Sequence, residues 1–313
     1  MKSFIMGKNE ENVRLSRFVV SVTNNLPTSL LYKSFRNKRI KVNGKAGSAD
    51  QRLNINDTVE LYINDEFFAE KKAPVKSKQP KLKIIYEDEN IAAIYKPAHL
   101  LCHSDRTGDA SVVDAFIEYL TEKGEYCSVN ENSFTPSICN RLDRGTEGLI
   151  LAAKNYAALR DMNEIIRTDL LLKTYYCITS GIPKKGRFKA YLKHFEKDNK
   201  VVIKPFAQNG YKEIITDIDV INAKSPLALC KIGLITGRTH QIRAHLAFLG
   251  TPVLGDIKYG SIKMNERYKM KAQCLCAVSV EFKNIPSENV LHYLQNKKIE
   301  LIEPEILKVF NNL

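Results

Sequence analysis

Three features are missing from the sequence: tryptophan, a glycine-rich phosphate-binding loop, and any apolar run near the roughly 20 residues that a membrane-spanning helix requires. The missing loop disfavours an NTPase or a dinucleotide-dependent enzyme. No signal peptide opens the chain, because the apolar stretch after Met1 is too short. These absences predict a soluble, cytoplasmic protein without a membrane span.

Cysteine is present but irregularly placed, at positions 102, 127, 139, 177, 230, 274 and 276. An odd number without regular spacing favours reduced thiols over a disulfide framework. Cys274 and Cys276 could form half of a metal site, but no second close pair follows them, so we interpret both as strand residues. The sequence therefore predicts neither a bound metal ion nor a cofactor.

Positive charge is what the sequence has in excess. Lysine and arginine total 48 against 35 acidic residues, which gives a formal net charge of +13 and a pI near 9.3. This excess favours a polyanionic partner, either nucleic acid or an anionic membrane surface. Residues 1–80 hold 15 basic and 8 acidic residues, a net charge of +7, which leaves +6 for the other 233. The hydrophobic content of 44% suffices for a buried core.

The chain is predicted to contain a small N-terminal domain, a linker and a larger domain. Residues 69–80 contain two prolines and no apolar periodicity, which is typical of an extended linker. Residues 12–68 form the small α+β domain. Its predicted elements are helices at 13–25 and 29–37, a strand at 39–45 that meets an Asn-Gly turn, and a strand at 58–63.

A cluster of basic residues lies in this small domain. Between positions 33 and 45 there are six basic residues and no acid: Lys33, Arg36, Lys38, Arg39, Lys41 and Lys45. A solvated helix face is the ordinary interpretation of such a run. Here the cluster spans a predicted helix end and the following turn, which can align several positive charges with one phosphate backbone. The six are therefore candidates for nucleic-acid contact.

Residues 81–313 are predicted to form a larger α+β domain. Its strands follow one another directly through the second half, which favours a large, mostly antiparallel or mixed sheet with flanking helices over alternating βαβ units. The predicted strands are 84–86, 91–95, 149–153, 174–179, 188–194, 213–221 and 227–234, and the predicted helices are 111–120, 156–168 and 239–249.

The most unusual segment, residues 139–148, reads Cys-Asn-Arg-Leu-Asp-Arg-Gly-Thr-Glu-Gly. Two glycines and the lack of periodicity predict a loop that leads into the buried strand 149–153, with Asp143 displayed where the strand begins. Arg141 and Arg144 flank this aspartate. On spacing alone, a structural surface ion pair is the commoner arrangement, and a functional carboxylate is the alternative.

A second unusual segment is residues 234–246, which include Gly-Arg-Thr-His-Gln. If a helix begins at Thr239, its buried face consists of Ile242, His245, Leu246 and Leu249, so that His245 is a core residue. Arg243 then shares the other face with His240. Because a helix start suits a phosphate group, Arg238 and His240 are further candidates for nucleic-acid contact. The two histidines are five residues apart, a poor spacing for metal ligands on one helix.

Together these segments resemble the RluA-type pseudouridine synthases. Residues 140–153 are similar to the family's His-Arg-Leu-Asp-x-x-Thr-Ser-Gly-Leu-Leu motif, residues 237–245 to Gly-Arg-Thr-His-Gln-x-Arg-x-His, and residues 254–260 to Gly-Asp-x-x-Tyr-Gly. Lys96-Pro97 with His103 resembles the family's opening motif, and Lys173-Thr174-Tyr175 its Lys-x-Tyr. Residues 14–63 resemble the S-four-like RNA-binding domain that often precedes this catalytic domain. The resemblance covers nearly the whole chain.

The resemblance implies an isomerase that converts uridine in RNA to pseudouridine without a cofactor. It assigns the nucleophile to Asp143 and the neighbouring cation that keeps it charged to Arg243. Tyr175 would stack on the uracil and assist a proton transfer, and Arg141 would fill the space left by the flipped uridine. Whether the carboxylate attacks the sugar or the ring is left open. The expected partner is RNA, with large-subunit ribosomal RNA ahead of transfer RNA, and a monomer suffices.

The chain departs from the family motifs at four positions. Asn140 replaces a histidine, Glu147 a serine, His99 a glycine and Cys276 a histidine. None of these changes removes the aspartate, the tyrosine or either arginine. We therefore expect activity to be retained.

Two other classes of protein fit part of the sequence. A non-catalytic RNA-binding or ribosome-assembly protein of the same fold would bind RNA without forming pseudouridine. A damaged Asp143 or Tyr175 would indicate such a protein, and both are intact. A membrane-surface protein would require a basic amphipathic helix with bulky apolar anchors, and no such helix is evident.

Overall fold

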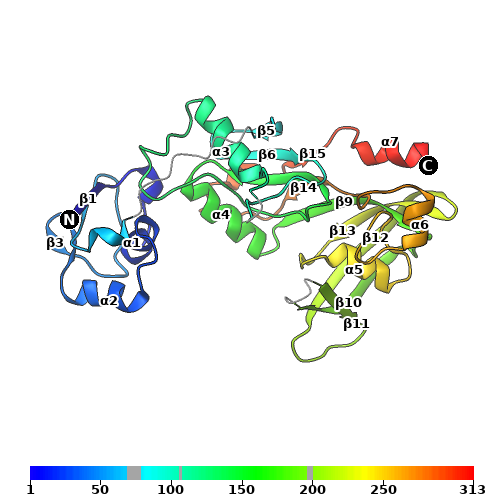
Figure 1. Cartoon of the computed structure of the whole chain (residues 1–313), viewed down its shortest axis with the longest axis horizontal. Coiled ribbons are helices and arrows are strands. Elements are labelled where there is room, and N and C mark those ends of the chain that lie inside the picture. The colour runs from blue at the N-terminus through cyan, green and yellow to red at the C-terminus, as the bar shows by residue number, and fades with distance from the viewer. Residues whose placement is uncertain (69–78, 106–107, 196–199) are drawn as a thin grey trace. The chain divides into compact units, whose positions relative to one another are not determined.

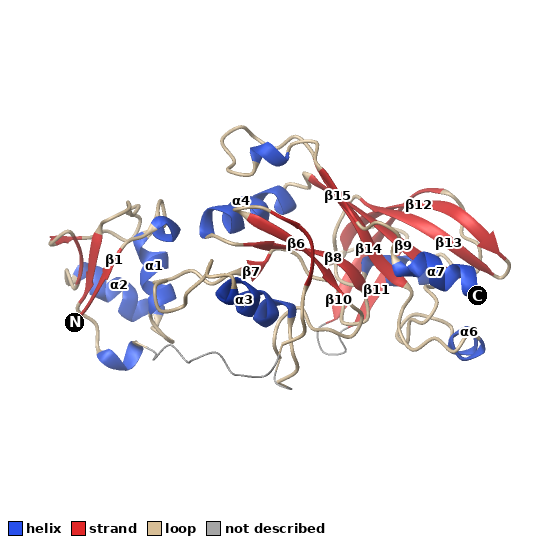
Figure 2. Cartoon of the chain, turned by 90° about the horizontal axis from the view of Figure 1, so that it is seen from above, coloured by secondary structure: helices blue, strands red, loops and turns tan. Residues whose placement is uncertain are grey.

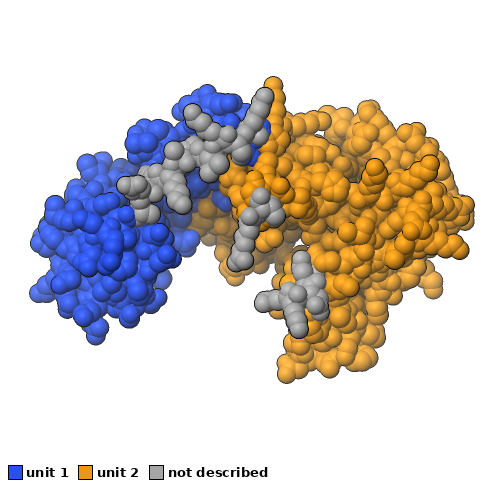
Figure 3. Space-filling view, in the orientation of Figure 1, with its two compact units in different colours: residues 1–79, 116–137, 154–157 blue, residues 80–115, 138–153, 158–313 orange. Residues whose placement is uncertain are grey.

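The computed structural model describes residues 1–68, 79–105, 108–195 and 200–313 (Figures 1 and 2). The chain divides into two compact units (Figure 3). Unit 1 comprises residues 1–79, 116–137 and 154–157, and unit 2 comprises residues 80–115, 138–153 and 158–313. Most of the predicted linker, residues 69–78, lies outside the described residues.

Unit 1 contains a four-stranded antiparallel sheet with the strand order β1-β4-β2-β3. Its elements are β1 (Lys2–Ile5), η1 (Lys8–Glu10), α1 (Leu15–Val22), α2 (Thr28–Arg36), β2 (Ile40–Val42), β3 (Lys45–Ala46), β4 (Thr58–Leu61) and η2 (Asp65–Phe67). Apolar side chains of the helices and strands share one core, in which Phe18, Ile40 and Leu61 are fully buried. Asn43 and Gly44 both have positive φ angles, as the predicted Asn-Gly hairpin turn requires.

A later segment of the chain, residues 116–137, completes unit 1. The Asn9 side-chain amide donates a hydrogen bond to Glu131 (2.8 Å), and the Ser133 hydroxyl donates to the buried Glu10 (2.6 Å). Strand β1 also lies before residue 12, where the small domain was predicted to begin. Unit 1 is therefore larger than the predicted small domain, and it is made of three separate segments of the chain.

Unit 2 contains an 11-stranded sheet with the order β11-β10-β12-β13-β9-β14-β8-β6-β5, with β15 beside β14 and β7 beside β8. Neighbouring strands are antiparallel wherever a register is described, except for the parallel pair β8 and β14. The strands are β5 (Lys83–Glu87), β6 (Ile91–Lys96), β7 (Ser137–Ile138), β8 (Glu147–Ala153), β9 (Leu171–Ser180), β10 (Gly186–Phe195), β11 (Lys200–Lys204), β12 (Lys212–Lys224), β13 (Leu227–Leu234), β14 (Leu275–Phe282) and β15 (Lys298–Glu300). The predicted α+β class with a large mixed sheet is confirmed.

Helix α3 (Val112–Glu122) lies mostly in unit 1, which includes residues 116–137. The other helices are α4 (Tyr156–Arg167), α5 (Gln241–Phe248), α6 (Ile262–Arg267) and α7 (Glu305–Asn312), with the short turn η3 (His292–Leu294). Helices α4, α6 and α7 can be followed in Figure 2. Helix α5 packs on β10 and β11 through Ala244, Leu192 and Val201. Helix α7 packs through Phe310 on a cluster that includes Leu229. No helix among the described residues is both long and apolar enough to cross a membrane.

Several elements differ from the sequence prediction. The predicted helix at 239–249 begins at Gln241, because His240 has a left-handed backbone with φ of 54° and cannot continue a right-handed helix. Strands β1, β11 and β15 and helices α6 and α7 were not predicted. All five are short, and a short apolar pattern does not separate strand from helix or loop.

Candidate active site

Asp143 stands in the loop at residues 139–146, directly before β8. Leu142 exchanges two hydrogen bonds with Cys102: the thiol donates to the Leu142 carbonyl (3.2 Å), and the Leu142 N–H donates to the sulfur (3.4 Å). The Thr146 N–H donates to the Asp143 carbonyl (3.0 Å), which closes a tight turn. The carboxylate is therefore presented from an anchored backbone.

Lys96, the last residue of β6, also holds the loop that carries Asp143. Its buried ammonium group donates to the carbonyls of Pro97 (3.0 Å), Leu100 (2.9 Å) and Arg144 (3.1 Å). Burial lowers the pKa of Lys96 to about 8, against the opposing influence of Cys102 and Asp143. No role was predicted for Lys96 from the sequence, and the structure shows that its hydrogen bonds connect two loops.

The start of β8 lies very close to β14. Gly148 has a φ of 120°, and a Cβ atom there would collide with the backbone of Ala277. Only glycine allows this approach. Just before β14, the Gln273 amide donates to the Thr146 hydroxyl (2.5 Å). The Asp143 loop is thus held by strands on both sides of β8.

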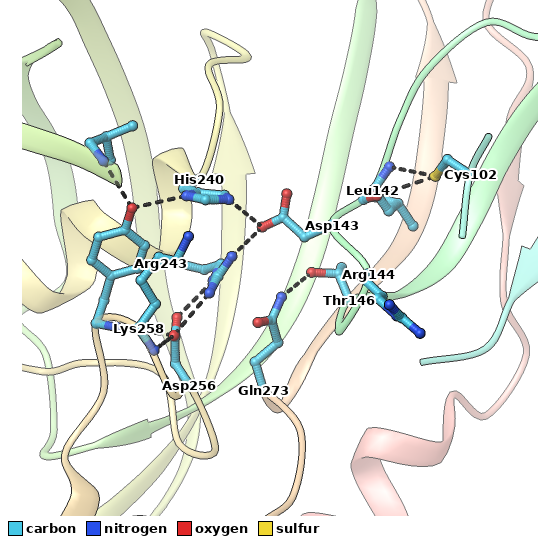
Figure 4. Close-up of polar contacts among 12 residues, drawn as sticks. Cys102, Leu142, Asp143, Arg144, Thr146, His240, Arg243, Asp256, Lys258 and Gln273 are labelled. Carbon is cyan, nitrogen blue, oxygen red and sulfur yellow. Dashed lines mark hydrogen bonds and ion pairs between the residues drawn. The ribbon is translucent and has the colours of Figure 1, made fainter. Parts of the chain in front are cut away.

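Arg243, on helix α5, links Asp143 to a second carboxylate (Figure 4). Its Nη1 donates to Asp143 Oδ2 at 2.6 Å, while Nε and Nη2 donate to the two oxygens of Asp256 at 2.7 and 2.9 Å. The exposed fraction of the side chain is 29% for Asp143, 7% for Arg243 and 0% for Asp256. The structure thus brings Asp143 and Arg243 together, and the arginine is buried although it was not placed on the buried face of the predicted helix.

Asp256 positions Arg243 and is in turn held by the backbone. Its Oδ1 also accepts hydrogen bonds from the N–H groups of Lys258 (2.8 Å) and Tyr259 (3.1 Å). Burial raises the pKa of Asp256, but the hydrogen bonds and charge of Arg243 and these two N–H groups lower it by more. Burial lowers the pKa of Arg243, and the two aspartates raise it by more. The result is one cation between two anions.

The role of Asp256 was missed by the sequence analysis, which quoted it only as part of Gly-Asp-x-x-Tyr-Gly. The glycine that precedes Asp256 is the feature of the sequence that could have drawn attention to it. Gly255 has a φ of 80°, and a Cβ atom there would collide with the carbonyl of Ala272, so the turn that presents Asp256 requires glycine.

His240 lies beside Asp143. Its ring Nδ1 is 2.9 Å from the Tyr259 hydroxyl, and its Nε2 is 3.8 Å from Asp143 Oδ2. Only 8% of its side chain is exposed. Burial lowers the pKa of His240 below its ordinary value, against the opposing charge of Asp143. The side chain therefore faces the carboxylate, whereas the sequence analysis had placed it among the RNA contacts.

A cavity of about 1260 Å³ opens above these residues and is lined by Asp143, Arg243 and Tyr175. Tyr175 lies on β9, the strand beside β14, and its side chain is buried. Burial, and then the charge of Asp143, raise the pKa of Tyr175, so its phenol is protonated at neutral pH. The volume exceeds the upper end of the usual range for small-molecule sites, roughly 1,000 Å³, which leaves room for more than one nucleobase.

Positive charges surround this cavity. Arg141, Arg238 and Lys271 are exposed, and Lys173 and Lys258 are half-buried. Their density suits a strongly anionic ligand.

Neither arginine that flanks Asp143 in sequence pairs with it. Arg144 forms an exposed ion pair with Asp109 (2.9 Å), and Arg141 reaches the cavity. The surface pairing that spacing alone favoured is therefore absent, and the partner of Asp143 is the distant Arg243.

The six basic residues predicted for nucleic-acid contact lie on unit 1. Five are exposed and Lys41 is half-buried, with its ammonium 5.1 Å from the Tyr62 ring centroid. They follow the end of α2, the turn after it, and the β2–β3 hairpin: Lys33, Arg36, Lys38, Arg39, Lys41 and Lys45. Within the described parts of the chain none of the six is in an ion pair, so their charges are not neutralised by neighbouring acids.

The departures from the family motifs have structural partners. The Asn140 carbonyl oxygen accepts the Leu151 N–H (2.8 Å), which closes the loop onto β8. Glu147 accepts a hydrogen bond from the Tyr95 hydroxyl (2.8 Å) and pairs across the strands with Cys276. Two of the four departures are therefore neighbours in space. His99 has a φ of 71°, the left-handed conformation that a glycine adopts more easily.

The structure also shows where the residues that were considered for metal binding or for the core lie. Among residues 1–68, 79–105, 108–195 and 200–313, no group of three or more His, Cys, Asp or Glu side chains could hold a metal ion. Cys276 lies within β14 and Cys274 directly before it. His245 is buried in the core as predicted, with its Nδ1 2.9 Å from the Thr216 hydroxyl.

The fold and the site are those expected of an enzyme with an anionic substrate. A buried arginine holds a carboxylate in a large cavity that is also lined by several basic residues, and such a cavity suits a nucleic acid. Residues 90–248 match the RNA pseudouridylate synthase family. The chain belongs to this family, whose members isomerise uridine in RNA to pseudouridine, and its substrate is RNA.

Individual relatives agree with this assignment. The chain is 34% identical over 304 residues to an uncharacterized RNA pseudouridine synthase of Mycoplasma capricolum, covering 96% of this chain and 97% of the relative. It is 30% identical over 266 residues to ribosomal large subunit pseudouridine synthase C of Rickettsia felis, covering 79% and 82%. The human RNA pseudouridylate synthase domain containing 1 has a similar fold, with a TM-score of 0.52 and 19% identity over 74% of this chain and 94% of that chain.

Proposed function

We propose that this chain converts uridine in large-subunit ribosomal RNA to pseudouridine, with Asp143 as the nucleophile. The observation that carries the proposal is the 2.6 Å ion pair between Asp143 Oδ2 and Arg243 Nη1 at the floor of the cavity. An ionised carboxylate is the nucleophilic form, and the arginine supplies the opposite charge that holds it in place.

The reaction needs no external oxidant or reductant. The carboxylate adds to the sugar or to the uracil ring, the bond between ribose C1′ and ring N1 breaks, and the uracil turns. A new bond then forms from C5 to C1′, the proton leaves C5, and N1 ends with a proton in its place. The carboxylate is released unchanged, so that substrate and product are isomers.

Tyr175 and Arg141 would act on the substrate from the walls of the cavity. The hydroxyl of Tyr175 is protonated at neutral pH and can donate a hydrogen bond, and burial raises its pKa further, while the ring offers an apolar face for the uracil. Arg141 is exposed at the cavity. We propose that its side chain fills the space in the base stack that the flipped uridine leaves. Arg238 supplies a further cation at the rim for a phosphate group.

Two observations support ribosomal RNA as the substrate. Relatives named as ribosomal large subunit pseudouridine synthase C match most of this chain. Unit 1, which we propose to be an S-four-like RNA-binding domain, carries the unpaired basic cluster. Pseudouridine mapping of total RNA from cells with and without this protein tests the assignment. Loss of a site in large-subunit ribosomal RNA supports it, whereas loss confined to transfer RNA contradicts the substrate class and leaves the reaction intact.

Neutralising the basic cluster of unit 1 is expected to weaken RNA binding and to reduce its dependence on salt. The variant carries Lys33→Gln, Arg36→Gln, Lys38→Gln and Lys45→Gln. Each lost phosphate contact lowers the slope of log K against log salt by roughly 0.7 to 0.9, so four contacts would lower it by about 3. Substitution is preferable to deletion of residues 1–80, because residues 116–137 pack on them.

The matched control removes the same charge from unit 2. Lys185, Arg187, Lys189 and Lys308 each face an acidic side chain, so changing them to glutamine should leave the slope near the wild-type value. Titrations of one RNA at several salt concentrations measure both variants. Equal slopes in the two variants would show that the cluster of unit 1 has no special part in binding.

Activity is expected to persist after exhaustive chelation of metal ions. The isomerisation is an exchange of bonds at one nucleoside, and a carboxylate nucleophile supplies the chemistry without a Lewis acid. The assay uses a short unstructured RNA, so that magnesium needed for RNA folding does not interfere. A requirement for added metal on that substrate would refute the expectation.

A further inference from the structure

His240 faces the same oxygen of Asp143 that Arg243 binds. Nη1 of Arg243 is 2.6 Å from Oδ2, and Nε2 of His240 is 3.8 Å from it. Among the described residues none donates a hydrogen bond to Oδ1, which carries no dashed line in Figure 4. One carboxylate oxygen is therefore held by the protein, and the other is available to the cavity.

The hydrogen bonds around Tyr259 favour one tautomer of His240. The Tyr259 hydroxyl accepts the Val201 N–H at 3.0 Å and lies 2.9 Å from His240 Nδ1. Because the Tyr259 oxygen already accepts the Val201 N–H, the hydroxyl hydrogen of Tyr259 is available to be donated to His240 Nδ1. The hydrogen of a neutral imidazole then lies on Nε2, the nitrogen that faces Asp143.

The backbone of His240 gives an independent indication that its position matters. It is a non-glycine residue in the left-handed region, with φ of 54°, at the start of α5. Such a conformation is unfavourable for a residue that carries a Cβ atom, and it persists where the surrounding contacts compensate for it. The ring is also packed edge-on against Tyr259, with centroids 5.6 Å apart, and the Tyr259 ring lies 5.3 Å from the Arg243 guanidinium carbon.

We propose that His240 is a positioning residue for Asp143: a neutral imidazole with its hydrogen on Nε2 that, together with Arg243, holds Oδ2 and leaves Oδ1 as the attacking atom. The proposal rests on the proposed function, because it assumes that Asp143 is the nucleophile. The 3.8 Å distance is longer than a hydrogen bond, and contacts of this kind commonly shorten when substrate displaces water.

The electrostatic surroundings are consistent with a neutral ring. Burial lowers the pKa of His240, Asp143 and Asp256 raise it, and Arg243 and Lys258 lower it, with a net decrease. A neutral donor orients the carboxylate without adding a second full positive charge, which would weaken it as a nucleophile.

The tautomer is testable without any assay of catalysis. In the full-length chain labelled with ¹⁵N, long-range ¹H–¹⁵N correlation separates protonated from unprotonated ring nitrogens, and the signals absent from His240→Gln identify this residue among six histidines. At pH 7 we expect hydrogen on Nε2 and none on Nδ1. Tyr259→Phe keeps the ring but removes the hydroxyl, so it should give a mixture of tautomers. Hydrogen on Nδ1 in the wild-type protein would overturn the proposal.

Kinetics then distinguish positioning from packing. His240→Gln places an amide donor near the position of Nε2, whereas the shorter His240→Asn cannot reach it. We expect kcat to fall up to about 100-fold in His240→Asn, with KM nearly unchanged, and to recover to within about tenfold of wild type in His240→Gln. Equal losses in both variants contradict a positioning role. If instead Asp143→Asn retains turnover, the proposed nucleophile fails while the tautomer result stands, so the two failures are distinguishable.

Discussion

Asp143→Asn is expected to abolish pseudouridine formation while RNA affinity stays within about tenfold of wild type, or roughly 1.4 kcal/mol. The amide has the size of the carboxylate, and its oxygen can still accept the hydrogen bond from Arg243 Nη1. It lacks the negative charge and the nucleophilicity that the reaction requires. Arg243 keeps its two hydrogen bonds to Asp256, so the fold around the site should remain.

The matched control is Asp217→Asn. Asp217 is also bound by an arginine, with two hydrogen bonds from Arg187 at 2.7 and 2.8 Å, but it lies on the exposed face of β12 and outside the cavity. The control removes the same charge and should retain wild-type turnover. Product yield and RNA affinity are measured on the same RNA for both variants. Substantial turnover by Asp143→Asn would exclude it as the nucleophile.

Local patterns were sufficient to predict much of the fold. The Asn43-Gly44 turn and the apolar run after Gly148 depend on neighbouring residues alone, and the hairpin and β8 are found where they were predicted. The loop that presents Asp143 was predicted for the same reason. The start of helix α5 was misplaced by two residues, because His240 has a left-handed backbone that no local pattern in the sequence indicated.

The parts of the site that could not be predicted depend on long-range contacts. Asp256 belongs to a quoted motif, but its pairing with Arg243 follows from a turn that brings residue 256 under helix α5. The burial of Arg243 could not be predicted for the same reason, since it depends on the ion pair with the buried Asp256. Cys102, which holds the Leu142 backbone, has no local signal that would separate it from the other cysteines.

Unit 1 illustrates the same limit on a larger scale. Its two helices and hairpin were predicted from periodicity and turn residues, whereas the contribution of residues 116–137 was not. That contribution is made by polar contacts such as the one between Ser133 and the buried Glu10, which leave no periodic pattern in the sequence. The amino-acid composition showed that the N-terminal region carries an excess of positive charge. It could not show which later segment of the chain would pack against that region.

Arg243→Met is expected to abolish activity and to lower the free energy of unfolding by about 3–5 kcal/mol. The arginine is the single cation between Asp143 and Asp256, and the Asp256 side chain is fully buried. Without Arg243 the protein must bury an uncompensated carboxylate. The exposed pair offers a control: Arg187→Met removes a similar bidentate contact, and we expect a much smaller loss, because both groups of this pair remain in contact with water. Urea unfolding of the three proteins measures these differences.

The stability difference should also depend on pH with a definite sign. Burial raises the pKa of Asp256, and in the wild-type protein Arg243 reverses this, so the net shift is downward from 3.8. The resulting stabilisation is fully present above the unfolded value and is lost as the pH falls through the folded pKa. In Arg243→Met the effect of burial is no longer opposed by the arginine, so protonation of Asp256 relieves the penalty. We therefore expect the difference in unfolding free energy between the wild type and Arg243→Met to become smaller as the pH falls toward about 4.

A second substitution separates the loss of stability from the loss of catalysis. In the double variant Arg243→Met with Asp256→Asn, no uncompensated charge is buried, and the amide oxygen still accepts the N–H groups of Lys258 and Tyr259. More than half of the lost unfolding free energy should return, because the penalty of an unpaired buried charge dominates the single variant. Activity should not return, since Asp143 still lacks the guanidinium that holds Oδ2. Recovery of turnover together with stability would mean that Arg243 supports the fold and has no part in positioning the nucleophile.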